Sequence, residues 1–252
     1  MFLHNYHTHT KRCHHAVGED REYIEAAIQS GLKTLGFSDH APYVLPIGNK
    51  SSSHRIFVED AQDYADSIQA LAKEYKNDIR ILFGYELEYY PDYHQEEMAF
   101  LKNFSPDYLI LGQHFIGNEQ PPVPSSSLAS DIGLTTYVTQ VIAGMQTGDF
   151  LYLAHPDVAG YRFSNEAIQN EYRRLCLAAK KLQIPLEINL LGVRQGRHYP
   201  DERFFSIAAE VGNDIVIGAD AHAPSELETM GLEQAMDMVK RLGLCLRTDP
   251  LL

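Results

Sequence analysis

The chain has 252 residues, a length that suits either one α/β barrel of ~250 residues or two smaller domains. Hydrophobic residues make up 44% of it and charged residues 22%, which excludes general disorder and indicates a sizeable core. With 21 basic and 34 acidic residues, the net charge of −13 argues against broad binding to nucleic acid or to an anionic membrane. This charge still allows a local basic pocket for one small phosphate.

Short apolar runs alternate along the chain with longer amphipathic runs. The apolar runs predict strands, in chain order at residues 2–6, 34–38, 79–83, 108–111, 150–154, 186–189 and 215–218. The amphipathic runs predict helices at residues 21–30, 58–75, 93–103, 134–145, 165–182, 201–211 and 225–242. This alternation is typical of βαβ crossovers, so we expect a single domain over residues 1–252 with a parallel sheet closed, or nearly closed, into a barrel.

Two long loop-like segments, residues 41–55 and 117–133, each follow the carboxyl end of a predicted strand. In a barrel this end is the rim of the active site, where long loops cover or shape a pocket. We therefore expect both segments to border a functional site.

The cysteines and the N-terminal residues indicate the cellular compartment. The three cysteines are Cys13, Cys176 and Cys245, and they are far apart in the sequence. We therefore expect no disulfide framework, and we expect the protein to reside in a reducing cytoplasm. The first residues lack the pattern of a signal peptide, and no apolar run approaches the ~20 residues of a membrane span. We expect a cytoplasmic protein with neither a membrane nor a nucleic acid as partner.

Histidine and carboxylate residues gather where the predicted strands end. Six of the seven strands are followed by such residues, which are His7, His9 and His15, Asp39 and His40, Glu86 and Glu88, His114, His155 and Asp157, and Asp220 and His222. Taken singly, each could be a core histidine or an ordinary rim carboxylate. Taken together, imidazoles and carboxylates at one rim are the ligand set of Zn, Mn or Fe(II). Their number exceeds the needs of one tetrahedral ion and favours two or three ions sharing a carboxylate.

The sequence resembles the PHP (polymerase and histidinol phosphatase) family, and its histidinol-phosphate phosphatase branch in particular. The resemblance lies in His7-Thr-His9-Thr, Cys13-His14-His15, Phe37-Ser-Asp39-His40-Ala-Pro, Gly84-Tyr-Glu86, Gly112-Gln-His114, His155-Pro-Asp157 and Gly218-Ala-Asp220-Ala-His222, with Gly192-Val-Arg194 and Tyr199-Pro200 pointing to the branch. It implies a distorted (β/α)7 TIM-like barrel with a trinuclear metal site.

The resemblance also implies a ligand set, with zinc, or else Mn, Fe or Co, as the metal. The ligands would be His7, His9, His15, His40, Glu86, His114, His155, Asp220 and His222, with Glu86 as the bridge. His15 is preferred to His14 because it follows His9 by six residues, as in the family. Asn5 stands where relatives often have an acid, which affects the orientation of ligands rather than their identity.

The implied reaction is hydrolysis of L-histidinol phosphate to L-histidinol and phosphate, a step of histidine biosynthesis. Bound ions would neutralise the phosphoryl oxygens, and a hydroxide bridging them would attack phosphorus. Arginine suits a further phosphate contact, and the candidates are Arg162 and Arg194, then Arg197, with His54 and Arg55 as a weaker pair. Asp39 and His198 are possible proton donors to the leaving alcohol. Glu88, Asp157 and Glu187 would meet the ammonium group of the substrate or hold a ligand imidazole.

Two other functions fit the same pattern. One is hydrolysis of another phosphomonoester or of a nucleotide phosphodiester, although the acidic charge argues against long nucleic acid. The other is a non-catalytic, metal-holding barrel that docks to a partner. It ranks last because all nine ligand positions carry competent donors.

Overall fold

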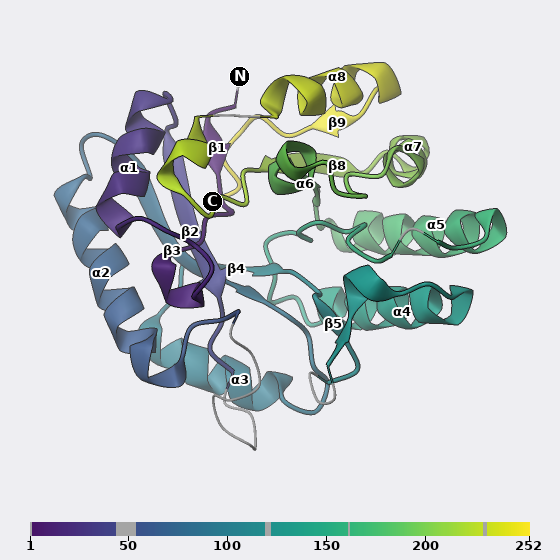
Figure 1. Cartoon of the computed structure of the whole chain (residues 1–252), viewed down its shortest axis with the longest axis horizontal. Helices are drawn as coiled ribbons and strands as arrows, with labels where there is room; N and C mark the ends of the chain where they lie inside the picture. The colour runs from purple at the N-terminus through teal and green to yellow at the C-terminus, as the bar shows by residue number, and fades with distance from the viewer. Residues whose placement is uncertain (1, 44–53, 119–121, 161, 229–230) are drawn as a thin grey trace.

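Parallel strands form a curled sheet with helices around it (Figure 1). The computed structural model describes residues 2–43, 54–118, 122–160, 162–228 and 231–252. The strands are β1 (His4–Asn5), β2 (Thr34–His40), β3 (Arg80–Leu87), β4 (Tyr108–Leu111), β5 (Phe115–Ile116), β6 (Val123–Pro124), β7 (Leu186–Asn189), β8 (Asp214–Gly218) and β9 (Cys245–Leu246). The α-helices are α1 (Asp20–Gln29), α2 (Ala61–Glu74), α3 (His94–Leu101), α4 (Asp131–Gln146), α5 (Asn165–Leu182), α6 (Leu190–Gln195), α7 (Glu202–Val211) and α8 (Leu232–Leu242).

Isolated parallel bridges join two sheets into a distorted ring. The larger sheet has the order β1-β2-β3-β4 and the smaller one the order β7-β8-β9. Leu153 forms a bridge with Leu111 on one side and with Leu186 on the other, and a bridge between Thr8 and Ala221 brings the two ends of the ring together. The prediction of a distorted TIM-like α/β barrel is therefore confirmed.

The predicted strand at residues 150–154 is reduced to the bridge at Leu153. On the side of β4, Tyr152 O and Ala154 N hydrogen-bond to the backbone of Leu111, whereas the backbone of Leu153 bonds to β7 and the residue before it. The N–H of Leu153 donates to Pro185 O at 3.0 Å, and its carbonyl accepts from Glu187 N at 3.0 Å. Pro185 has no N–H, so the ladder between this segment and β7 cannot extend toward their amino ends. The missing donor at Pro185 explains why the strand predicted at residues 150–154 is shorter in the structure.

Most predicted helices are present, but the last one is divided. Residues 225–242 contain the 3₁₀ turn η5 (Pro224–Leu227) and the helix α8, which begins after Gly231 at φ 90°. Helix α6, strand β9 and the hairpin of β5 with β6 were not predicted, and the hairpin extends into the predicted loop 117–133. Residues 44–53 of the predicted loop 41–55 and residues 119–121 lie outside the described residues. None of the described helices is both long and apolar enough to cross a membrane.

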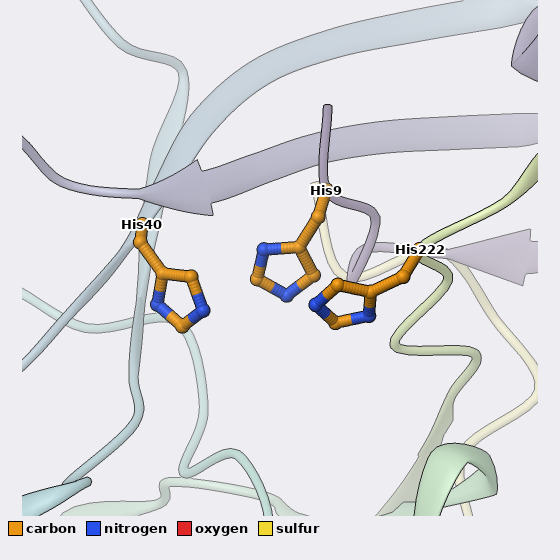
Figure 2. A group of neighbouring side chains, drawn as sticks. All are labelled: His9, His40 and His222. Atoms are coloured by element: carbon orange, nitrogen blue, oxygen red, sulfur yellow. The ribbon is translucent and has the colours of Figure 1, made fainter. Parts of the chain in front are cut away.

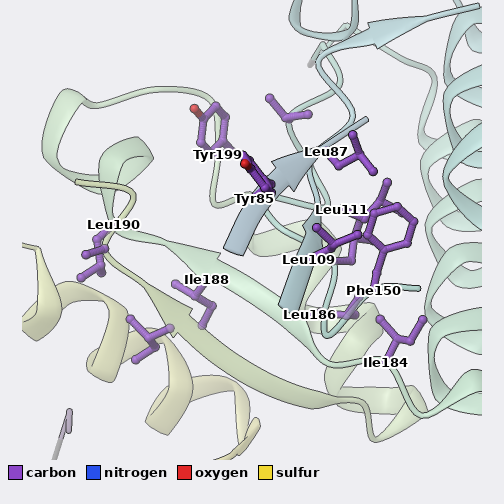
Figure 3. Packing of buried hydrophobic residues seen from close by; sticks show 14 of the residues in the cluster. Tyr85, Leu87, Leu109, Leu111, Phe150, Ile184, Leu186, Ile188, Leu190 and Tyr199 are labelled. Carbon is purple, nitrogen blue, oxygen red and sulfur yellow. The ribbon is translucent and has the colours of Figure 1, made fainter. Parts of the chain in front are cut away.

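Alternating residues of the strands build two apolar layers. In β4, Leu109 and Leu111 belong to the larger core, which packs between strands and helices (Figure 3). Tyr108 and Ile110 belong to a second cluster, together with Tyr6, Leu82, Tyr152, Ala154 and Val216. Because side chains of a strand alternate between two faces, this second cluster lies on the inner face of the ring. The inner face continues toward the carboxyl ends of the strands, where the polar residues lie.

Tyr108 fills the interior of the ring, and two glycines leave room for it. A Cβ atom at Gly36 would lie 2.3 Å from Tyr108 Oη, and one at Gly84 would lie 2.7 Å from its ring. The hydroxyl of Tyr108 donates to Tyr6 O at 2.7 Å, and Phe37 O is a second acceptor at 3.1 Å. A polar group at the centre of the barrel is thus satisfied by the backbone of β2 and of the segment that follows β1.

Asn5 supports the closure of the ring, and its loss should destabilise the fold. Its side chain is buried, accepts from Ala219 N at 2.8 Å and donates to Thr8 Oγ1 at 2.7 Å. We expect Asn5→Ala to lower the free energy of unfolding of the metal-free protein by about 1–3 kcal/mol, because buried groups lose their partners. Urea denaturation measures this change. Asn103→Ala, at an exposed position, is the control and should stay within about 0.5 kcal/mol, and equal losses in both variants would contradict the role of Asn5.

Candidate metal centre

The nine predicted ligands lie together at the carboxyl ends of the strands. Figure 2 shows three of them, His9, His40 and His222, which come from three segments and direct their rings toward one another. His40 ends β2 and Glu86 lies near the end of β3. The others follow strand ends or the bridge at Leu153, and they are His7, His9, His15, His114, His155, Asp220 and His222.

Glu86 lies at the centre of this group, with its two oxygens facing different histidines. Its Oε2 is 3.2 Å from His40 Nδ1, 3.4 Å from His7 Nε2 and 3.5 Å from His9 Nε2. Its Oε1 is 2.7 Å from His155 Nε2. His114 approaches the same oxygen, with Nε2 at 3.6 Å. The carboxylate of Glu86 thus lies between two sets of imidazoles, with one oxygen directed to each set.

His15 joins the histidine group and His14 does not. The Nε2 atoms of His15 and His222 are 3.0 Å apart, and the ring centroids of His15 and His9 are 6.1 Å apart. His14 is exposed and its ring packs against Phe57, with centroids 4.1 Å apart. The structure thus brings His15 to the histidine group and leaves His14 outside it.

Several buried polar atoms of the group lack hydrogen-bond partners within the described residues. They are His7 Nε2, His9 Nε2, Glu86 Oε2 and Asp220 Oδ1. Asp220 Oδ1 lies 3.1 Å from His9 Nε2 and 3.6 Å from His7 Nε2, so these atoms converge on one region. Leaving such atoms unpaired is costly, whereas a divalent cation accepts electron pairs from all of them. The donor set therefore fits a metal centre.

Burial keeps two of the imidazoles neutral, whereas nearby histidines keep the carboxylate of Glu86 ionised. Burial raises the pKa of Glu86, but His114, His40 and His7 together lower it well below its usual value. Burial lowers the pKa of His40 well below its ordinary value and that of His222 to about 3. A neutral imidazole and an ionised carboxylate are the forms that bind metal.

Three carboxylates hold the outer ring nitrogens of ligand histidines. The pairs are His7 Nδ1 with Glu187 Oε1 at 2.8 Å, His114 Nδ1 with Glu88 Oε1 at 3.1 Å, and His9 Nδ1 with Asp39 Oδ1 at 3.4 Å. Each pair places a proton on Nδ1 and directs Nε2 toward the centre. Of the two roles expected for the acidic residues, Glu88 and Glu187 thus take that of holding an imidazole.

A cavity of about 620 Å³ opens onto the centre, and two arginines line it within the described residues. Arg197 is one of them and is exposed, with Nε donating to Gln195 and a terminal nitrogen to Tyr199 Oη at 2.6 Å. Arg55 is buried, and its guanidinium donates to both oxygens of Glu88, at 3.1 and 3.2 Å. Arg197 is thus an exposed cation beside the site, whereas Arg55 is held in a buried ion pair.

The other two predicted arginines do not line the cavity. Arg162 is exposed, and Arg194 directs its guanidinium to the carbonyl oxygens of Ala219 and Asp220, at 2.8 and 3.1 Å. This placement differs from the predicted phosphate contact because backbone carbonyls already occupy the fork of Arg194. Among the predicted arginines after strand ends, the structure therefore brings Arg197 alone to the cavity.

Two further predicted residues also lie away from the cavity. Asp157 is buried and accepts a hydrogen bond from Asp201 N at the start of α7, and burial raises the pKa of its carboxyl to about 8. Asp39 is buried between His9 and Thr10, whose N–H donates to it at 3.0 Å. Neither residue lines the cavity, so Asp39 is not placed to give a proton to a substrate there, and Asp157 is not placed to bind one. His198 does line the cavity, and its Nε2 donates to the carbonyls of residues 158 and 159.

Two residues that support the centre were not singled out from the sequence. Asn189 donates to Asp220 Oδ2 at 3.0 Å, and its position at the end of the sixth predicted strand is a signal that could have revealed it. Glu226 accepts from His222 N at 2.7 Å. It falls in a segment expected to be helical, so no pattern marks it.

Comparisons with known proteins agree with this geometry. The model of the PHP domain family matches residues 5–190. The protein of Deinococcus radiodurans named probable histidinol-phosphatase is 29% identical over 233 residues, which is 88% of this chain and 86% of that protein. The histidinol-phosphatase of Bacillus subtilis is 31% identical over 117 residues, 44% of this chain and 43% of that protein.

A solved structure supports the fold. Histidinol phosphate phosphatase from Lactococcus lactis, complexed with Zn, L-histidinol and phosphate, superposes with a TM-score of 0.71. The two chains are 18% identical, and the match covers 97% of this chain and 95% of the other. At this level of identity the likeness establishes the fold of the barrel.

The two adjacent histidines should differ sharply in metal binding. We expect His15→Ala to lower both the zinc content and kcat, because its imidazole lies among the other donors. His14→Ala is the matched control and should retain the zinc content of the parent, since its ring packs on Phe57 outside the group. Elemental analysis of zinc-loaded, desalted protein measures the difference, and equal losses or the reverse order would overturn the assignment.

Proposed function

Because the chain belongs to the PHP domain family, we propose that it is a metal-dependent phosphatase that hydrolyses L-histidinol phosphate to L-histidinol and phosphate in histidine biosynthesis. The observation that carries the proposal is Glu86, placed between two sets of imidazoles below a cavity that Arg197 also lines. The relatives named for this activity, one of them complexed with Zn, L-histidinol and phosphate, support the choice of substrate.

The metal ligands fall into overlapping groups that would hold two or three ions, with zinc as the proposed metal. His9, His40 and His222 form one group of close donor atoms, and His7, His155 and Asp220 form another. Glu86 contributes one oxygen on each side. When bound, divalent ions supply Lewis-acid charge that neutralises a phosphate ester and activates water.

The side chains around the cavity suit a small phosphorylated alcohol. Arg197 would bind phosphoryl oxygens, because a guanidinium is planar, permanently charged and able to form two parallel hydrogen bonds. His198 would supply the proton to the leaving alcohol through Nδ1, because its Nε2 donates to backbone carbonyls and because, of the two proposed donors, it is the one that lines the cavity. Glu187, Glu88 and Asp39 would keep the ligand imidazoles oriented during the reaction.

The central test is a steady-state assay of zinc-loaded protein with L-histidinol phosphate, simple phosphomonoesters and a phosphodiester. We expect L-histidinol phosphate to have the highest kcat/KM and chelation to abolish its hydrolysis. Glu86→Gln should reduce turnover to background, because it removes the charge between the two sets of imidazoles. The metal-free variant should still unfold cooperatively in urea, since the apolar layers build the core. A preference for another substrate, or activity that survives chelation, would contradict the proposal.

Arg197 gives a separate test of phosphate recognition. We expect Arg197→Ala to lower kcat/KM by roughly 30- to 1000-fold, equivalent to ~2–4 kcal/mol, through loss of a charge-assisted contact in the transition state. Arg197→Lys should recover little because an ammonium group cannot form the same pair of hydrogen bonds. Zinc content should stay unchanged in both variants. Arg241→Ala on α8 is the control, and a loss of less than threefold in Arg197→Ala would refute the contact.

A further inference from the structure

Helix α6 is short, and the residue that caps its first turn also hydrogen-bonds to a proposed metal ligand. Asn189, the last residue of β7, accepts a hydrogen bond from Gly192 N at 3.1 Å and thereby caps the helix. The amide nitrogen of the same side chain donates to Asp220 Oδ2 at 3.0 Å. The position of α6 is therefore set by the residue that also holds the carboxylate of Asp220.

Near its other end, α6 holds the backbone around Asp220. The two terminal nitrogens of Arg194 donate to Ala219 O at 2.8 Å and to Asp220 O at 3.1 Å. The side chain of Arg194 is only 5% exposed, so these bonds are shielded from water. Asp220 has φ 47°, a left-handed conformation that a residue other than glycine adopts only at an energetic cost. Such a conformation persists only where neighbouring groups hold it.

Glu226 connects Arg194 to the second ligand of this turn. Its Oε2 lies 3.3 Å from a terminal nitrogen of Arg194 and accepts from His222 N at 2.7 Å. Glu226 belongs to the 3₁₀ turn η5 that directly follows the strand-end segment. One carboxylate thus joins the guanidinium to the backbone of His222.

We propose that Arg194 and Glu226 are positioning residues that fix Asp220 and His222 for metal binding. The two ligands belong to different groups of donors, since Asp220 lies with His7 and His155 whereas His222 lies with His9 and His40. A single ion pair, between the buried guanidinium of Arg194 and the half-buried carboxylate of Glu226, therefore sets the spacing between the two groups. The proposal depends on the metal centre of the proposed function but not on the identity of the phosphorylated substrate.

The geometry distinguishes this role from a direct phosphate contact. In Arg194 both terminal nitrogens are directed to backbone carbonyls, and the residue does not line the cavity. Lysine has one nitrogen at its tip and cannot serve two successive carbonyls and Glu226 in the same planar arrangement. Arg194→Lys should therefore retain only part of the function of Arg194.

Zinc titration of the metal-free protein tests the proposal without any substrate. We expect Arg194→Ala and Glu226→Ala each to weaken zinc binding about 10- to 100-fold, the usual effect of removing a group that orients a ligand. Glu226→Gln should lose less than Glu226→Ala, because its amide oxygen still accepts from His222 N. The losses in the double variant should be less than additive, since both residues act on one turn. Arg173→Ala, in the exposed pair of Arg173 with Glu210, is the control.

Urea unfolding of each metal-free variant separates positioning from loss of the fold. If zinc affinity falls while cooperative unfolding is retained in Arg194→Lys or Glu226→Gln, the proposal holds even where an alanine variant fails to fold. If every folded variant binds zinc like the parent, the proposal is overturned. In that case a rise in KM for L-histidinol phosphate would instead assign Arg194 to the substrate. Failure of the proposed function would appear separately, as normal zinc binding by the parent without hydrolysis of this ester.

Discussion

The burial of one carboxylate, Glu86, is the constraint on which the rest of the centre depends. A charged carboxylate inside a protein requires compensating positive charge or hydrogen bonds. Here imidazoles supply the nearby nitrogens, and several of the buried atoms have no hydrogen-bond partner within the described residues. This arrangement is poorly satisfied by protein groups alone and is well suited to cations. The same electron-rich cluster that would cost stability in metal-free protein thus provides the affinity for metal.

The barrel provides this cluster through the alternation of residues along its strands. In β3, Leu82 packs in the inner apolar cluster, Gly84 makes room for Tyr108, and Glu86 follows on the same face. In β8, Val216 lies in the inner cluster and Asp220 follows four residues later. In both cases, the inner face changes from an apolar side chain to a proposed metal ligand four residues later along the chain. A rigid apolar floor beneath the ligands restricts their movement and so favours a defined geometry.

The sequence allowed the strand ends and their donors to be predicted because both have local signals. Apolar runs mark the strands, and a parallel barrel necessarily brings their carboxyl ends to one rim. The direction of a side chain has no such signal. Arg194 and Arg197 are three residues apart in the sequence, yet Arg194 binds backbone carbonyls and Arg197 lines the cavity. Likewise, the link from Glu226 to His222 depends on a 3₁₀ turn where the pattern indicated a continuous helix. Contacts of this kind follow from tertiary packing.

The bridge between Thr8 and Ala221 has a consequence for how the chain assembles. It lies between ligands that are separated by more than two hundred residues, with His7 and His9 on one side and Asp220 and His222 on the other. A metal ion held by both pairs would act as a cross-link between the two ends of the barrel, closing a very long loop. The full set of donors forms only when the intervening segments have also brought His40, Glu86, His114 and His155 to the same rim. Tight metal binding would therefore report that the whole barrel is complete, and a partly folded chain would hold its ions weakly.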